Sequence, residues 1–211
     1  MGLVVIETYL FKFCLPLDTV AAINDLQKRI ALFEDMKAYR ELYEMLFYNL
    51  HRFSYAFVRS RETAEEIVSD VFIKVWQMRG RLTEIRNLKE YLYIITKNFS
   101  LNYLTKNYKN KTVCLDDIQF ETVAQIRTPE DLYISVDMLN HIRETIGQLP
   151  PKCKIIFQLI REDGLQYKEV ASILNISVFT VRNQLAIAVK KIGETLPQNL
   201  LLHKTAHSIK P

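Results

Sequence analysis

Two short apolar repeats of helical period constrain the fold of this chain more than any other feature. They lie in residues 166–192, "QYKEVASILNISVFTVRNQLAIAVKKI". The first predicts a helix over 167–174, and the second predicts a longer helix from 178 onward. Asn175 tolerates a positive φ at the turn, and Ser177 can cap the second helix. The segment therefore predicts a helix-turn-helix whose buried residues are Val170, Ala171, Leu174, Val181, Leu185, Ala188 and Ile192.

The outward face of the second helix is a candidate reader of duplex DNA. Arg182 and Asn183 can reach base edges in the major groove, whereas Lys190 and Lys191 suit phosphates. We also expect Ile187 and Val189 on this face, with few charges, so its affinity for DNA should be modest. The alternative is an ordinary antiparallel helix pair with a solvated face. The candidate DNA-contacting residues are Ser177, Phe179, Thr180, Arg182, Asn183, Ala186 and Lys190.

The rest of the chain is also patterned as helix. It has only five Gly and six Pro in 211 residues, which disfavours turn-rich β folds. We predict an all-α protein with two small helical domains joined by a flexible linker. The expected divisions are an N-terminal extension (1–23), a first domain (24–107), a linker (108–127), a second domain (128–196) and a C-terminal tail (197–211).

Local signals place the expected helix ends. Asn24 or Asp25 can cap the first helix, and Thr63 can cap a later one that Gly80 would end. A further helix is expected from near Asn87. Thr128, followed by Pro129 and two acidic residues, predicts the start of the second domain's first helix.

Charge is unevenly distributed along the chain. Residues 79–111 contain eight Lys or Arg and two Glu, whereas residues 112–139 contain six acidic residues and one Arg. The basic block also holds Tyr91, Tyr93, Phe99, Tyr103 and Tyr108, although such aromatics often belong to a core. Interleaved rings and cations suit single-stranded DNA, because rings stack on unpaired bases and cations follow phosphates.

An acidic stripe is expected on the helix "AEEIVSDVFIKVW". A surface of this kind is poor for DNA but suitable for docking another protein, although a charged stripe is usually only a solvated face. Its residues are Glu65, Glu66, Ser69, Asp70 and Ile73.

Other classes of function find little support in the residues. The sequence has no nucleotide-binding loop and no nucleophile–base arrangement, and its four His are scattered, so we do not expect an enzyme. Cys14, Cys114 and Cys153 have neither metal-ligand spacing nor a disulfide pattern. We expect no metal and no cofactor. No apolar run reaches the length of a membrane span, so no stable membrane insertion is expected.

The sequence resembles the extracytoplasmic-function (ECF) group of the sigma-70 family, the bacterial RNA polymerase specificity subunits. The resemblance is carried by "RETAEEIVSDVFIKVWQMRGRL" and "NLKEYLYIITKNFSLNYL", followed by "LPPKCKIIFQLIREDGLQYKEVASILNISVFTVRNQLAIAV". It spans about residues 24–196 and keeps both domains in order. It implies a cytoplasmic sigma factor that directs transcription initiation from specific promoters.

The resemblance also implies partners and sites. Region 2, the first domain, would dock on core RNA polymerase through Glu66, Ser69, Asp70 and Ile73. It would melt the −10 element and bind its single strand. Region 4, the second domain, would read the duplex −35 element. An anti-sigma factor is a further implied partner. The residues implied at the −10 element are Arg86, Lys89, Tyr93, Lys97, Asn98, Asn102 and Lys106.

One alternative remains open. A free-standing helix-turn-helix regulator would use the second domain without docking on core polymerase. The acidic stripe separates the two hypotheses, because such a regulator does not need it. Base preference cannot be carried over, since Gln184, Ala186, Ile187 and Val189 stand where many members of the family have Arg, His or Lys.

Overall fold

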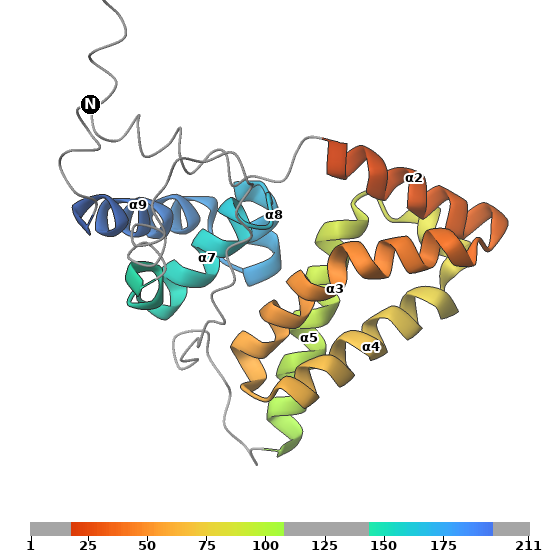
Figure 1. Ribbon diagram of the computed structural model, residues 1–211, viewed down its shortest axis with the longest axis horizontal. Coiled ribbons are helices and arrows are strands. Elements are labelled where there is room, and N and C mark those ends of the chain that lie inside the picture. The colour runs from red at the N-terminus through yellow and green to blue at the C-terminus, as the bar shows by residue number, and fades with distance from the viewer. Residues whose placement is uncertain (1–17, 108–143, 196–211) are drawn as a thin grey trace, which may run out of the picture.

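The computed structural model describes residues 18–107 and 144–195, and within them every regular element is a helix. Two helical units lie side by side (Figure 1). The all-α prediction is confirmed. The first unit consists of α2 (Asp18–Phe33), α3 (Met36–Val58), α4 (Arg61–Gln77), the 3-10 helix η1 (Arg79–Glu84) and α5 (Leu88–Asn107). The second consists of α7 (Pro151–Arg161), α8 (Tyr167–Leu174) and α9 (Val178–Thr195).

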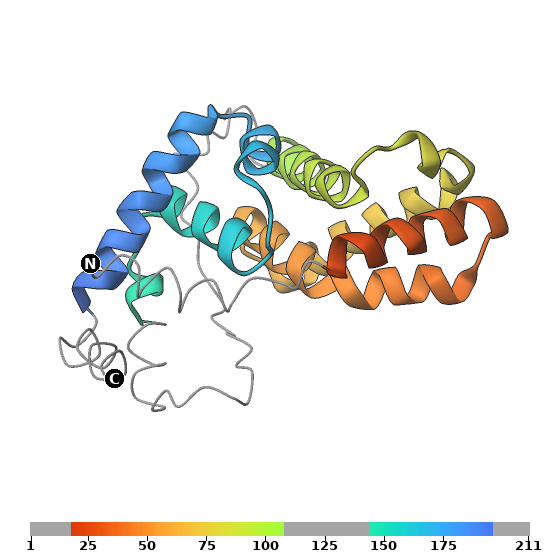
Figure 2. The ribbon, with the colours of Figure 1, turned by 90° about the horizontal axis from the view of Figure 1, so that it is seen from above.

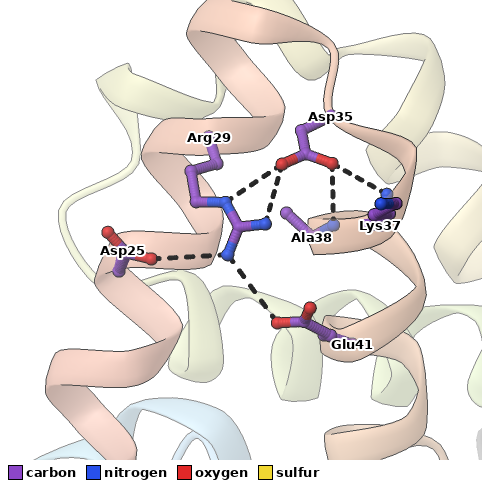
Figure 3. Close-up of polar contacts among 6 residues, drawn as sticks. All are labelled: Asp25, Arg29, Asp35, Lys37, Ala38 and Glu41. Carbon is purple, nitrogen blue, oxygen red and sulfur yellow. Dashed lines mark hydrogen bonds and ion pairs between the residues drawn. The ribbon is translucent and has the colours of Figure 1, made fainter.

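A polar network fixes the corner between α2 and α3 (Figure 3). Asp35 caps α3 by accepting the backbone N–H groups of Lys37 at 2.8 Å and Ala38 at 3.1 Å. Its other carboxylate oxygen accepts two hydrogen bonds from Arg29, the shorter at 2.8 Å. The hydrogen bond from Arg29 is the main cause that lowers the pKa of Asp35 below its ordinary value. The hydrogen bonds from the backbone N–H groups of Ala38 and Lys37 lower it further. Asp35 therefore holds both helices at one corner.

Helix α2 begins earlier than predicted. Its first residue is Asp18, so Asn24 and Asp25 lie inside the helix, both exposed, and neither caps it. Ile23 is buried together with Leu26 and Ile30, and this stripe continues the helical pattern toward the N-terminus.

The predicted ends of α4 also need correction. The N-cap is Ser60, whose Oγ accepts the backbone N–H of Thr63 at 3.2 Å, and Thr63 itself lies in the first turn with a buried side chain. The chain turns before this cap through Arg59, which has a φ of 56°. At the other end α4 stops at Gln77, and Gly80 lies inside η1.

Aromatic side chains join α3 to α4. The Tyr39 hydroxyl donates to the Phe72 carbonyl at 2.9 Å, and its ring lies 5.1 Å from that of Trp76, centroid to centroid. The Arg79 guanidinium lies 4.9 Å from the centre of the Trp76 ring. Trp76 is half-buried against the core.

The second unit has the helix-turn-helix that the sequence predicts. Asn175 takes a left-handed conformation with a φ of 56°, and Ser177 Oγ accepts the backbone N–H of Thr180 at 3.0 Å. The expected inward residues are all buried: Val170, Ala171, Leu174, Val181, Leu185, Ala188 and Ile192. The helix expected from Thr128 begins outside the described residues.

None of the described helices has by itself the length and hydropathy of a membrane span. Helices α8 and α9 reach that threshold only when taken together, and they meet at a bend of 107°.

Candidate nucleic-acid interface

The first turns of α9 present an open face. Ser177, Phe179, Arg182 and Asn183 are exposed, and Phe179 keeps 72% of its surface accessible. Two features turn these side chains outward: the Ser177 cap fixes the start of α9, and the opposite side of the helix is buried through Val181, Leu185, Ala188 and Ile192. Ala186 and Lys190 are also exposed further along, whereas Thr180 is half-buried with its hydroxyl 2.8 Å from that of Ser177. The face at the start of α9 is therefore the one that the sequence predicted.

One residue of α9 lies elsewhere than expected. Val189 is buried, so it does not belong to the outward face, and that expectation was wrong. Gln184 turns toward α7, where its side-chain oxygen accepts the Cys153 thiol at 2.9 Å. Lys190 stays exposed and lies 3.9 Å from Glu194, a surface ion pair of little energetic weight.

The seven residues expected at the −10 element divide into two groups. Arg86, Asn98, Asn102 and Lys106 are exposed. Tyr93 is fully buried, Lys89 is buried and Lys97 is half-buried. Burial raises the pKa of Tyr93 well above its ordinary value and lowers the pKa of Lys97. In this arrangement Tyr93 cannot stack on a base, because its ring lies inside the core against Phe53.

The second unit is what covers Lys89 and Lys97, since α8 packs against α5 (Figure 2). Lys89 Nζ donates to the Asp163 carbonyl, and Lys97 Nζ donates to the Ile173 carbonyl at 2.5 Å. Asn87, just before α5, donates to the Glu169 carboxylate at 2.6 Å. The same carboxylate accepts the backbone N–H of Gln166, which caps α8.

Arg52 on α3 is a residue that the sequence analysis did not single out. Its guanidinium donates to the Glu162 carboxylate and, at 2.6 Å, to the Asp163 carboxylate. The Arg52 and Asp163 side chains are 9% and 2% exposed. Burial raises the pKa of the Glu162 and Asp163 carboxyl groups above their ordinary values. One Arg among the polar residues of a long helix gives no sequence signal, so only the packing of the two units reveals this contact.

The acidic stripe on α4 is exposed. Glu65, Glu66 and Asp70 are open to solvent, Ser69 is partly so, and Ile73 keeps 52% of its surface accessible. A carboxylate-rich surface with one accessible aliphatic side chain suits a basic protein partner. Elsewhere in residues 18–107 and 144–195, no group of His, Cys, Asp or Glu could hold a metal ion.

Comparison with known proteins gives the same two regions in the same order. The family model for sigma-70 region 2 matches residues 39–110, and that for sigma-70 region 4 matches residues 139–192. The chain is 24% identical to the RNA polymerase sigma-H factor of Pseudomonas aeruginosa over 66% of this chain and 76% of that protein. It is 25% identical to the ECF RNA polymerase sigma factor SigW of Bacillus subtilis over 72% of this chain and 84% of that protein.

A solved structure shares the fold. It is the sigma factor RpoE of Bartonella quintana, crystallised in complex with the anti-sigma factor NepR. The TM-score is 0.51 at 20% sequence identity, over 76% of this chain and 97% of that one. With both family models matched, the chain belongs to the sigma-70 family and, within it, to the ECF group of sigma factors. The first unit is hereafter region 2 and the second region 4.

Proposed function

We propose that this sigma factor directs transcription initiation by docking on core RNA polymerase through α4, binding the −10 element through region 2 and reading the −35 element through α9. The observation that carries the proposal is the exposed acidic stripe on α4, present in the same chain as an exposed α9 face. A protein that only bound DNA would have no use for such a stripe.

The polymerase contact is assigned to Glu66, Ser69, Asp70 and Ile73. Their exposure supports this assignment, because a docking surface must be accessible before the partner arrives. The carboxylates would meet basic residues on the polymerase, and Ile73 would supply apolar area at the centre of the contact.

The −35 contact is assigned to the first turns of α9. In helix-turn-helix proteins the N-terminal residues of the second helix enter the major groove. Arg182 can pair bidentately with guanine and Asn183 with adenine. Ser177, Phe179, Thr180 and Ala186 would line the same groove, and Lys190 would contact phosphate.

The −10 contact is assigned to the exposed residues Arg86, Asn98, Asn102 and Lys106 as the protein stands, joined by Lys89 and Lys97 when region 4 moves off α5. Tyr93 is assigned no contact with DNA, because its ring is part of the core beneath this surface. Promoter melting by this surface requires the two regions to separate.

An anti-sigma factor remains a proposed partner. The support is the resemblance of this chain to ECF sigma factors and the fold shared with an RpoE that was crystallised with one.

Run-off transcription with purified core polymerase and promoter fragments tests the proposal. We expect transcripts with discrete starts only when both the sigma factor and core polymerase are present. The free-standing regulator would instead bind promoter duplex tightly without polymerase and would add no new start sites.

A further inference from the structure

We propose that Phe179, Ala186 and Ile187 contact thymine methyl groups in the major groove of the −35 element and so select thymine at defined positions. This role rests on the proposed function, in which the first turns of α9 enter that groove. It adds a second kind of base contact to the hydrogen bonds assigned to Arg182 and Asn183. The three residues are called the apolar trio.

The exposed apolar side chains of region 4 gather on its helix-turn-helix. Among residues 144–195, the large apolar side chains that stay exposed are Tyr167, Phe179 and Ile187, with 38%, 72% and 41% of their surface accessible. Tyr167 begins α8, and the other two lie on α9. Ala186, beside Ile187, is also exposed. Single exposed apolar residues are common, but a cluster on the face that a helix-turn-helix turns toward DNA indicates apolar contacts there.

Apolar and polar side chains alternate along this face of α9. Phe179, Asn183, Ala186 and Lys190 are all exposed and follow one another at helical spacing, so they form one stripe opposite the buried side of the helix. Ile187 lies beside this stripe. Each apolar side chain is followed about one turn later by a side chain that can hydrogen-bond. The bases that face the apolar trio should therefore alternate with bases read by hydrogen bonds.

Thymine offers an apolar group in the major groove. Its C5 methyl projects into the groove beside the hydrogen-bonding edges of the base pairs, and side chains such as Ala and Phe contact this methyl in protein–DNA complexes. Phosphates are bound instead by cations and hydrogen-bond donors, which the apolar trio lacks. The trio should therefore contribute sequence preference and little general affinity for DNA.

The spacing of the apolar trio sets the distance between the thymines. Phe179 and Ala186 are seven positions apart, which corresponds to a rise of about 10 Å along α9. Successive base pairs lie about 3.4 Å apart along the duplex axis, so the two side chains are separated by roughly three base-pair steps. We expect thymines, on either strand, at two places about that far apart, with the bases read by Arg182 and Asn183 between them.

Replacing thymine by deoxyuridine tests this role, because the change removes the C5 methyl and keeps the base pairing. Preferred −35 elements are first selected from a randomised duplex library by the full-length protein with core polymerase. Binding to a selected duplex is then compared with binding to the same duplex in which one thymine at a time is deoxyuridine. Each contacted methyl should contribute about four-fold in affinity, the typical effect of burying one such group.

Substitutions in α9 identify which side chain contacts which methyl. Phe179→Ser should bind the thymine duplex more weakly than the wild type and lose nothing further when the matching thymine becomes deoxyuridine. Ile187→Ser should do the same at the second place, and Phe179→Leu should keep part of the preference. Phe33→Ser is the matched control, because Phe33 on α2 is also exposed, at 76%, and should leave every methyl effect unchanged. Circular dichroism ensures that each variant keeps its helical content.

Selected −35 elements without thymine would overturn the proposal, and so would deoxyuridine duplexes that bind as tightly as thymine duplexes. A Phe179→Ser protein that keeps the wild-type loss at every thymine would show that Phe179 contacts no methyl. Equal weakening of all duplexes by this variant, with thymine or with deoxyuridine, would assign Phe179 to a contact with a protein and would overturn its role in base reading.

These outcomes are separate from those that test the proposed function. A protein that initiates transcription with core polymerase but selects thymine-free −35 elements would remove the methyl contacts alone. A protein that binds duplex DNA by itself but adds no start sites would remove the proposed function. The comparison of thymine with deoxyuridine, made in that case with the protein alone, still decides the role of the apolar trio. Wild-type protein that binds no duplex, with or without polymerase, would remove both.

Discussion

Arg52 and Asp163 lie far apart in the sequence, yet Arg52 Nη2 and Asp163 Oδ1 are 2.6 Å apart and both side chains are almost completely buried. The pair joins α3 of region 2 to the end of α7 in region 4. Removing one partner of a buried ion pair commonly costs about 3–5 kcal/mol, because the other charge is left without compensation. A single substitution at either residue should therefore destabilise the packing of region 4 on region 2.

Charge reversal on α4 should weaken polymerase binding. Asp70→Lys, alone or with Glu66→Lys, places a cation where the polymerase is expected to present cations, at a cost on the order of several kcal/mol. Both positions are exposed, so the fold should survive. Co-purification with core polymerase is the measurement, and Asp25→Lys, the same change on exposed α2, is the matched control. Undiminished recovery of the double variant with polymerase would remove the docking assignment.

Arg182→Ala and Lys190→Ala should act differently on α9. Loss of a bidentate base contact costs about 1–3 kcal/mol of discrimination, so Arg182→Ala should relax the preference at one or two adjacent −35 base pairs. Lys190→Ala should weaken all promoters about equally and lower the salt dependence of binding. Transcription from a library of randomised −35 elements separates the two. A uniform loss from Arg182→Ala would make it a phosphate anchor.

The wild-type protein alone should bind duplex promoter DNA weakly. Lys89 and Lys97 are covered by region 4, and the exposed face of α9 has few cations. Addition of core polymerase should then reveal sequence preference. A gel shift with and without polymerase measures this, and tight sequence-specific binding by the isolated chain would favour the free-standing regulator.

Short-range signals in the sequence predicted the helix-turn-helix well. Asn175 and Ser177 act on their own neighbours, so the turn and the cap follow from local chemistry. The start of α2 was missed because Ile23, which extends its buried stripe, was not counted in the pattern. Val189 was placed outward although it is buried, which shows that the apolar stripe of α9 is wider than the four residues used to define it.

The contact between the regions could not be predicted in the same way. Arg52, Lys89 and Lys97 look like ordinary surface cations in the sequence, and Glu162 and Asp163 look like a polar helix end. Their pairing depends on how two separately patterned units pack, and a single sequence has no periodicity at that distance. The same packing explains why Lys89 and Lys97, two of the seven expected −10 residues, are not exposed. Tyr93 is covered because its ring lies in the core against Phe53.

Trp76 gives the molecule a built-in optical probe of one region. It is the single Trp of the chain, and it lies in region 2 between Tyr39 and Arg79. Its fluorescence during thermal unfolding therefore reports on region 2 alone, whereas far-ultraviolet dichroism reports on the helices of both regions. Coincident melting curves would mean that the regions unfold as one cooperative unit, and separated curves would measure, without any label, how much each region depends on the other for its stability.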